Sequence, residues 1–395
     1  MSVNTSERVA KVKPSATIAV SMKAAELRAA GRDVLSLSAG EPDFPTPEHI
    51  GNAAIAAIHN GETRYTAVDG TPVLKQAIKN KLQRDNQLSY EANQILVSGG
   101  AKQCIYNLLA AAINAGDEVI IPAPYWVSYP DMVRLVDGEP VVITTGPQQS
   151  FKVTPKQLRA ALTDKTRLII LNSPSNPSGK AYTRAEYQAL GAVLADFPNV
   201  VVVSDEIYEH IYWGSEPFIS FATACPELID RTVVINGVSK SYAMTGWRIG
   251  YAAGPAGLIK EMRKVQSQTT SNPCSIAQAA AVAALDGDQE CVKVMNRAFH
   301  ERHDLFVKGL NELPGVECLP GEGAFYAFPS FQAVIDARDD IADDVELAGW
   351  LLETVGVATV PGTAFGQPGH LRLSYASSNE DLEEALKRLR QALSA

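Results

Sequence analysis

The chain has 395 residues, of which 46% are hydrophobic and 20% are charged. This is an ordinary globular composition, and the length favours two domains over a single core. The formal net charge of −9 disfavours nucleic acid and anionic membranes as partners, because both repel an acidic surface.

The sequence also argues against membrane insertion and secretion. No run of about eighteen apolar residues is present, and the N-terminal segment lacks the apolar core of a secretory signal. The five cysteines are scattered and lack the spacing of a metal site. We therefore expect reduced thiols, no bound metal and a cytoplasmic location.

The first part of the chain alternates between apolar strands and helices. The proline-marked segment Asp43–Pro47 is a hinge candidate, and a helix over Gln103–Ala112 follows a short apolar strand. Apolar strands are predicted at Glu118–Pro122, Arg167–Leu171, Val200–Val203 and Thr232–Ile235. Between them, Thr183 is a suitable N-cap for a helix over Ala185–Ala195. This order predicts an α/β fold with a mostly parallel sheet that is covered by helices on both faces.

The pattern changes beyond Leu285. A long amphipathic helix is predicted over Gln289–Leu313, and strand-like pieces follow at Gly323–Phe328 and His370–Tyr375 before a terminal helix from Asn379. This indicates a smaller α+β domain. We expect an N-terminal arm that adds to the small domain (1–45), a large ligand-binding domain (46–287) and the small C-terminal domain (288–395).

Polar residues follow several of the predicted strands. Asn176, Asp205 and Lys240 each come shortly after a different strand, and Trp126 follows another. Carboxyl ends of parallel strands meet at one edge of a sheet, where ligands bind. Singly, these residues are explained as a turn, a helix N-cap, a surface cation and a core aromatic. Their joint occurrence indicates a binding site.

One chemistry uses all of these groups. A lysine amine condenses with a carbonyl cofactor, of which pyridoxal phosphate (PLP) is the common example. A carboxylate such as Asp205 keeps the ring nitrogen of PLP protonated by ion pairing. Asn176 and Tyr208 can donate hydrogen bonds to the phenolate oxygen, and Trp126 can stack on the ring.

The same sequence contains a candidate binding site for a phosphate group. Gly99, Gly100, Ala101 and Lys102 lead into a predicted helix, whose N-terminal N–H groups favour an anion. Alone, a Gly-Gly pair before a helix is often only a tight turn, and it matches neither the Walker A nor the dinucleotide spacing. Arg248 and Ser239 would complete this site.

Several motifs, in this order, resemble class I aminotransferases of PLP fold type I. They are SAGEPDF (38–44), SPSNPSG (173–179), SDEIYEH (204–210), SK (239–240), MTGWRIGY (244–251) and LRLSYA (371–376). Within the family, the chain looks similar to the bacterial-type aspartate aminotransferases that include aspartate/prephenate enzymes. The resemblance runs from KPSAT (13–17) to the C-terminal helix, and it implies that residues 46–287 bind PLP.

The resemblance implies a role for each matching residue. Cofactor binding falls to Lys240 through a covalent bond, to Asp205 at the ring nitrogen, to Asn176 and Tyr208 at the phenolate oxygen, to Trp126 by stacking, and to Gly100, Ala101, Lys102, Ser239 and Arg248 at the phosphate. Tyr65 would reach the phosphate of a partner subunit, which implies a homodimer with shared active sites. Arg372 would bind the substrate α-carboxylate, with Gly40, Trp126 and Asn176 alongside. The chain departs from the pattern at Gly237, where some relatives carry another serine.

The resemblance also implies a substrate class. Lys102 and the segment with Lys13, Ser15 and Thr17 would meet a distal carboxylate, which favours ping-pong transamination between aspartate or glutamate and 2-oxoglutarate or oxaloacetate. Lys13 also suggests prephenate as an additional or alternative substrate. The alternative for Lys13 is a solvated lysine, the usual state of that residue.

Three other functional classes compete with this interpretation. Another fold type I enzyme, such as a lyase, a decarboxylase or a cyclopropane-type synthase, would use the same cofactor site. A nicotinamide-dependent dehydrogenase would need a G-x-G-x-x-G motif after its first strand, which we do not find. A ligand-sensing regulator would carry a DNA-binding domain and is disfavoured by the acidic composition.

Overall fold

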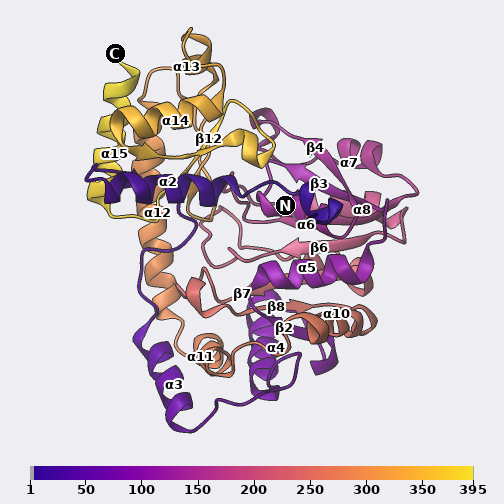
Figure 1. Ribbon diagram of the computed structural model, residues 1–395. Coiled ribbons are helices and arrows are strands. Elements are labelled where there is room, and N and C mark those ends of the chain that lie inside the picture. The colour runs from indigo at the N-terminus through magenta and orange to yellow at the C-terminus, as the bar shows by residue number, and fades with distance from the viewer. Residues whose placement is uncertain (1–3, 395) are drawn as a thin grey trace.

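The computed structural model describes residues 4–394. Within them, one sheet of seven strands has the order β2-β8-β7-β6-β5-β3-β4 (Figure 1). Its strands are β2 (Ile95–Ser98), β3 (Glu118–Ala123), β4 (Glu139–Thr144), β5 (Thr166–Asn172), β6 (Val201–Asp205), β7 (Thr232–Gly237) and β8 (Gly250–Ala253). Only β8 pairs antiparallel, with β2 and with β7. The predicted mostly parallel sheet is confirmed.

Both faces of this sheet are buried, because helices cover each of them. In β3, Val119 and Ile121 pack on one face and Ile120 packs on the other. The first face is covered by α5 (Ala101–Ala112), α6 (Ser128–Leu135) and α10 (Ala256–Thr269). The other is covered by α3 (Glu48–His59), α4 (Pro72–Asn86), α7 (Pro155–Ala161), α8 (Arg184–Ala195), α9 (Phe221–Ala224) and α11 (Ser275–Asp286). Double burial explains the continuous apolar strands.

The predicted helix starts agree with the local capping chemistry. Thr183 caps α8 in a capping box, in which its hydroxyl accepts from the Glu186 N–H and the Glu186 side chain accepts from the Thr183 N–H. The helix predicted from Gln103 begins two residues earlier, because Gly100 serves as the N-cap of α5. The strands β4 and β8 were not predicted. Most of β4 is exposed or half-buried and its apolar run is short, while β8 has the sequence GYAA, which contains no β-branched residue.

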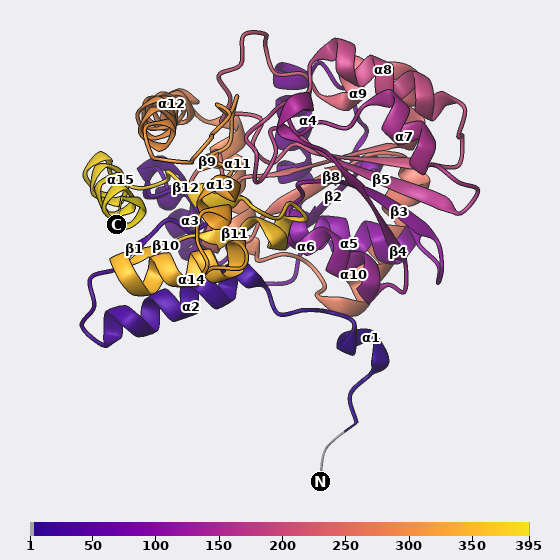
Figure 2. The same ribbon diagram turned by 90° about the horizontal axis from the view of Figure 1, so that it is seen from above.

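A second region lies beside the seven-stranded sheet (Figure 2). It contains the sheets β1-β10 and β11-β12-β9, with Leu35 of β1 in parallel register with Val357 of β10. Its strands are β1 (Leu35–Ser36), β9 (Tyr326–Ala327), β10 (Val357–Ala358), β11 (Val360–Pro361) and β12 (Leu371–Ser374). Its helices are α2 (Ala16–Ala29), α12 (Glu290–Asn311), α13 (Gln332–Asp336), α14 (Asp344–Val355) and α15 (Asn379–Leu393), while α1 (Glu7–Ala10) precedes them. The boundaries at 45 and 287 stay a prediction.

The long helix α12 joins this second region to the rest of the chain. It has 22 residues and buries Phe299, Phe306 and Leu310 in the core of the second region. Charged residues occupy its other face, as the amphipathic sequence predicts. Across residues 4–394, no helix combines the length and the apolar character needed to cross a membrane.

Candidate active site

The carboxyl ends of β5, β6 and β7 lie side by side at one edge of the sheet. Asn172 ends β5 and is in register with Asp205, which ends β6, and Asp205 is in register with Ile235 of β7. The chain continues from β7 through Gly237 to Lys240. Three separate segments therefore bring their polar residues to one place, as the sequence predicts.

These segments surround a cavity of about 300 Å³. Most of the predicted site residues line it: Ser15, Thr17, Gly40, Ala101, Lys102, Trp126, Asn176, Asp205, Tyr208, Ser239, Lys240, Arg248 and Arg372. Gly100 does not line the cavity, although the adjacent Ala101 does. Lys13 is exposed and does not line the cavity, and Tyr65 is 92% exposed on another surface of the chain.

Asp205 is a buried carboxyl group with a strong hydrogen-bond partner. Its Oδ2 accepts from the Tyr129 hydroxyl at 2.6 Å, and its Oδ1 accepts from the Ile207 N–H at 3.3 Å. Burial raises the pKa of Asp205 to about 6, and the Tyr129 hydrogen bond acts in the opposite direction. A cationic group placed in the cavity would favour the carboxylate form.

Lys240 presents its amine to the cavity. Its Nζ donates to the Gly40 carbonyl oxygen at 2.5 Å. Desolvation in the cavity, followed by the charge of Arg372, lowers the pKa of Lys240 to about 8. Near neutral pH, a larger fraction of Lys240 than of an exposed lysine is therefore the neutral amine, which is the nucleophilic and basic form.

Arg372, on β12, is a buried cation whose hydrogen-bond partners are both neutral. Nη1 donates to Asn176 Oδ1 at 3.2 Å, and Nη2 donates to the Ser38 carbonyl oxygen at 2.7 Å. The guanidinium lies 4.4 Å from the centroid of the Tyr326 ring. Among the residues described, nothing accepts a hydrogen bond from the buried Nε. The group is therefore suited to bind an anion.

The start of α5 faces Arg248 at another end of the cavity. Arg248 donates to the Thr245 and Gly99 carbonyl oxygens at 2.9 and 3.1 Å. Gly100 has φ 97°, and a Cβ at this position would collide with the Arg248 guanidinium. N–H groups in the first turn of a helix have no partner within the helix. Together with Arg248, they form a cradle that suits a phosphate group.

Lys102 adds a further positive charge. Its Nζ lies 4.8 Å from the centroid of the Trp126 ring, which corresponds to a cation–π contact. Burial, followed by the charge of Arg248, lowers the pKa of Lys102. Ser15 and Thr17 line the same cavity from the N-terminal segment. This part of the cavity thus offers a cation and hydroxyl groups to a ligand.

Several cavity residues escaped the sequence interpretation, and Tyr129, Asn172 and Tyr326 are those among them whose side chains make hydrogen bonds to predicted site residues. Tyr129 bonds to Asp205, while the Tyr326 hydroxyl lies 3.0 Å from that of Tyr208. Asn172 accepts from the Asn176 N–H and donates to the Asp205 carbonyl oxygen. Only Asn172 carried a signal, since it directly ends an apolar strand. The two tyrosines lie in segments that the sequence links to no motif.

The structure explains the departure at Gly237. A Cβ built there would lie 2.8 Å from the Ile249 carbonyl oxygen and 2.9 Å from the Gly250 Cα. Both atoms belong to the neighbouring backbone, so they cannot move without shifting the strand. In this chain the position therefore favours glycine over serine.

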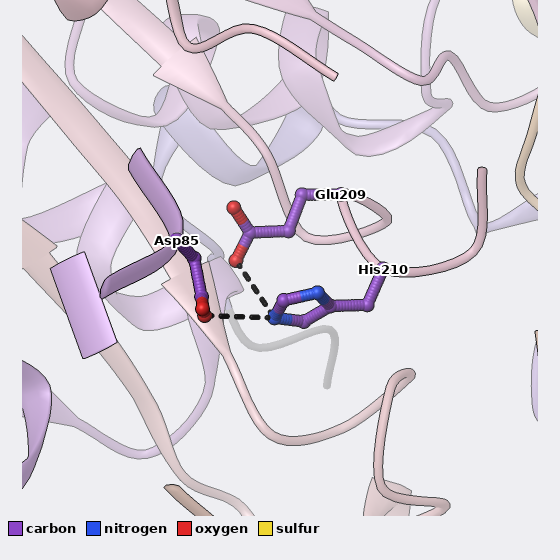
Figure 3. A group of neighbouring side chains, drawn as sticks. All are labelled: Asp85, Glu209 and His210. Atoms are coloured by element: carbon purple, nitrogen blue, oxygen red, sulfur yellow. Dashed lines mark ion pairs between the residues drawn. The ribbon is translucent and has the colours of Figure 1, made fainter. Parts of the chain in front are cut away.

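Asp85, Glu209 and His210 form a cluster of possible metal ligands. Ligand atoms of Asp85, Glu209 and His210 lie within 4.8 Å of one another, and their side chains point toward a common centre (Figure 3). However, the buried Lys81 ammonium contacts Glu209 directly and lies 3.9 Å from Asp85. The chain itself thus supplies the cation that these carboxylates attract.

Comparisons with known proteins agree with this geometry. Residues 32–389 match the family described as Aminotransferase class I and II. The chain belongs to this family. These PLP-dependent aminotransferases include the aspartate/prephenate aminotransferase of Nitrosomonas europaea, which is 52% identical over 98% of this chain and 99% of its own length.

Solved aminotransferase structures have the same fold. The aspartate aminotransferase of Rhizobium meliloti has a TM-score of 0.96 at 47% identity, covering 100% of this chain and 99% of its own. The Thermus thermophilus aspartate aminotransferase with maleate has a TM-score of 0.93 at 42% identity, covering 99% and 100%. The expected fold type I architecture is confirmed.

Proposed function

We propose that this aminotransferase uses PLP held at Lys240 to exchange amino groups between L-aspartate or L-glutamate and the corresponding 2-oxo acids. The cavity in which Lys240, Asp205 and Arg372 meet carries this proposal. It combines a nucleophilic amine, a buried carboxyl group and a buried guanidinium with an unused donor. An aminotransferase needs these groups for cofactor attachment, ring protonation and substrate binding.

The residues present fit the cofactor at each of its polar groups. Asp205 would pair with the ring nitrogen, Tyr208 and Asn176 would face the phenolate oxygen, and Trp126 would cover the ring. Arg248, Ser239 and the first turn of α5 would hold the phosphate, in the cradle that a side chain at Gly100 would fill. When bound, PLP supplies an electron sink for the charge left on the substrate α-carbon.

The chain's own residues would orient the substrate and move its proton. Arg372 would bind the α-carboxylate through its free Nε and neighbouring donors, which fixes the direction of the Cα–H bond. Lys240 Nζ, which the substrate amine would have displaced from the cofactor, would then take the proton from the α-carbon. Its pKa of about 8 makes the neutral amine available near neutral pH.

The charge distribution supports dicarboxylic substrates. Lys102, Ser15 and Thr17 line the cavity and would contact a distal carboxylate. The Thermus thermophilus relative was solved with maleate, a dicarboxylate. Prephenate, a 2-oxo acid with a second carboxylate, is proposed as an additional or alternative substrate. The exposed Lys13 would serve it only by turning toward the cavity.

We further propose a cytoplasmic homodimer. Tyr65 is an aromatic residue that is 92% exposed in the single chain, which is unusual for so large a side chain and is consistent with a contact across a subunit interface. In the dimer, Tyr65 would complete the phosphate site of the partner subunit.

Two measurements test the function. Borohydride reduction with PLP, followed by peptide mass mapping, should label Lys240, and a label on another lysine would contradict the assignment. Steady-state rates with aspartate, glutamate and prephenate should show dicarboxylate preference, with an oxo acid of unchanged carbon skeleton as product. Activity restricted to aromatic or branched donors, or loss of carbon dioxide from the substrate, would rule out the proposed specificity or reaction.

A further inference from the structure

A second group of buried polar residues lies behind the active site. Glu209 and Lys81 are 5% and 1% exposed, respectively, and form an ion pair. Asn86 and Asn236, also buried, complete the group, and His210 lies at its edge. We refer to Lys81, Asn86, Glu209 and Asn236 as the rear cluster.

Glu209 is the centre of the rear cluster. Its Oε1 contacts Lys81 Nζ and accepts from Asn236 Nδ2 at 2.9 Å, while its Oε2 accepts from Asn86 Nδ2 at 2.8 Å. Lys81 Nζ also donates to Asn86 Oδ1 at 2.7 Å. Both carboxylate oxygens thus have donors, so the site needs no ligand to satisfy them.

The four residues of the rear cluster come from three separate parts of the fold. Lys81 and Asn86 belong to α4, Asn236 belongs to β7, and Glu209 lies in the turn that follows β6. The adjacent residue in that turn, Tyr208, lines the cavity together with Asp205. Asn236 precedes Lys240 by four residues and also accepts from the Gly237 N–H at 2.7 Å. The rear cluster therefore joins two segments that carry active-site residues.

We propose that Glu209 is a positioning residue for the active site. Together with Lys81, it fixes from behind the turn that follows Asp205 and carries Tyr208, and the end of β7 that leads to Lys240. The consequence for cofactor binding rests on the proposed function, whereas the effect on the turn is a property of the protein alone.

The electrostatics favour one arrangement of these groups. Burial acts to raise the pKa of Glu209, but the charges of Lys81 and His210 and the hydrogen bonds from Lys81 and Asn86 lower it overall. The carboxylate thus stays charged. A buried charge loses much of its stabilising interaction energy when a partner moves away. The network therefore resists displacement of α4, the turn and β7 from one another.

The test compares Glu209→Gln with a control in α4, the helix that carries Lys81 and Asn86. Lys75 is a second buried lysine of α4, 7% exposed, whose Nζ donates to Asp69 Oδ2 at 2.5 Å and to the Ala92 carbonyl oxygen at 3.0 Å. Lys75→Met removes an ion pair that is less buried than Lys81–Glu209, with side chains 9% and 15% exposed, and that does not contact the turn. Two quantities are measured, namely amide hydrogen exchange over 205–211 in cofactor-free protein and the dissociation constant for PLP.

We expect Glu209→Gln to accelerate exchange over 205–211 and to weaken PLP binding, each by about tenfold or more, as loss of a charged hydrogen bond predicts. Lys75→Met should lower the thermal midpoint yet leave both quantities within about twofold of the unsubstituted protein. Equal effects of the two variants, or unchanged exchange over 205–211 in Glu209→Gln, would overturn the proposal.

A milder variant keeps the test decisive if Glu209→Gln does not fold. Asn236→Ala retains the Glu209–Lys81 pair and removes the hydrogen bond from Asn236 to Glu209, together with the one from the Gly237 N–H to Asn236. Exchange is therefore compared over 238–241, where a smaller change in the same direction is expected, and no change there would count against the proposal. If the unsubstituted protein binds no PLP, the proposed function fails, while the exchange rates still decide the positioning role.

Discussion

Two groups of buried charges lie on opposite sides of one short turn, and they differ in how fully the protein satisfies them. Behind the turn, the Glu209 carboxylate has donors on both oxygens and a lysine as its counter-ion. In front of it, Arg372 is held only by neutral oxygens, and its Nε has no acceptor within the described part of the chain. Saturated groups stabilise one arrangement, whereas unsaturated groups beside a cavity are available to a ligand.

Two consecutive residues of the turn face the two groups. Tyr208 faces the cavity, and Glu209 faces α4. Substitutions on the cavity side of the turn should therefore change catalysis more than the free energy of unfolding. Substitutions in the rear cluster should change the free energy of unfolding at least as much as they change catalysis. The predictions below test that contrast in order of expected size.

The largest effect is expected for Lys240→Ala. The substitution removes both the amine that would bind the cofactor and the base that takes the α-proton, so kcat should fall by about 10⁴-fold or more. Coupled steady-state assays with aspartate and 2-oxoglutarate measure it. Lys240→Arg, which keeps a charge but not a usable base, should be similarly inactive, and retention of substantial activity in either variant would refute the role.

The next largest effect is expected for Arg372→Ala. Loss of the buried guanidinium removes a charged, hydrogen-bonded contact to the substrate carboxylate, so kcat/KM for aspartate should fall by about 10²–10³-fold. Its counterpart behind the turn, Lys81→Met, leaves Glu209 unpaired and should cost about 3–5 kcal/mol in the free energy of unfolding. Kinetics and chemical denaturation of both variants compare the groups, and a greater stability loss for Arg372→Ala would break the contrast.

Tyr129→Phe should change the pH dependence of cofactor binding. Asp205 has a raised pKa of about 6, so its carboxylate, and with it the affinity for PLP, should be lost as pH falls through about 6. The Tyr129 hydroxyl stabilises the charged form of Asp205. Its removal should therefore raise, by about one unit, the pH at which affinity for PLP is lost. Titration of PLP binding between acidic and neutral pH measures the shift.

A control for Tyr129→Phe is available in the same fold. The buried Tyr90 hydroxyl has no hydrogen-bond partner among residues 4–394. Tyr90→Phe should therefore leave the pH at which affinity for PLP is lost unchanged. An equal shift of that pH in both variants would argue against a specific effect on Asp205.

The smallest effect is expected for Lys102→Ala. Lys102 is partly exposed and would contact only the distal carboxylate, so KM should rise about fivefold for aspartate and little for alanine. A parallel rise for both amino acids would contradict a role in dicarboxylate recognition. The same measurement applies to the exposed Lys13, for which the KM for prephenate is compared between Lys13→Ala and the unsubstituted protein.

The sequence predicted the residues on the cavity side of the turn better than those of the rear cluster. Asp205 and Lys240 follow apolar runs directly, so the geometry of a parallel sheet suffices to bring them together. Tyr129 and Tyr326 meet their partners through tertiary packing that no local pattern encodes. The same is true of Lys81, which in the sequence resembles any helical lysine. Tyr65 remains a prediction, because its proposed contact needs a second chain.

The single antiparallel strand of the large sheet has a further consequence. Because β8 runs back beside β7, with Gly237 and Gly250 in register, one short connection carries Ser239, Lys240, Thr245 and Arg248 into the cavity. The amine and the guanidinium are thus fixed relative to each other by the length of one closed loop. Deletion or insertion of a single residue there would disrupt both together. Apart from the residues that line the cavity, this connection should therefore tolerate side-chain exchange far better than any change in length.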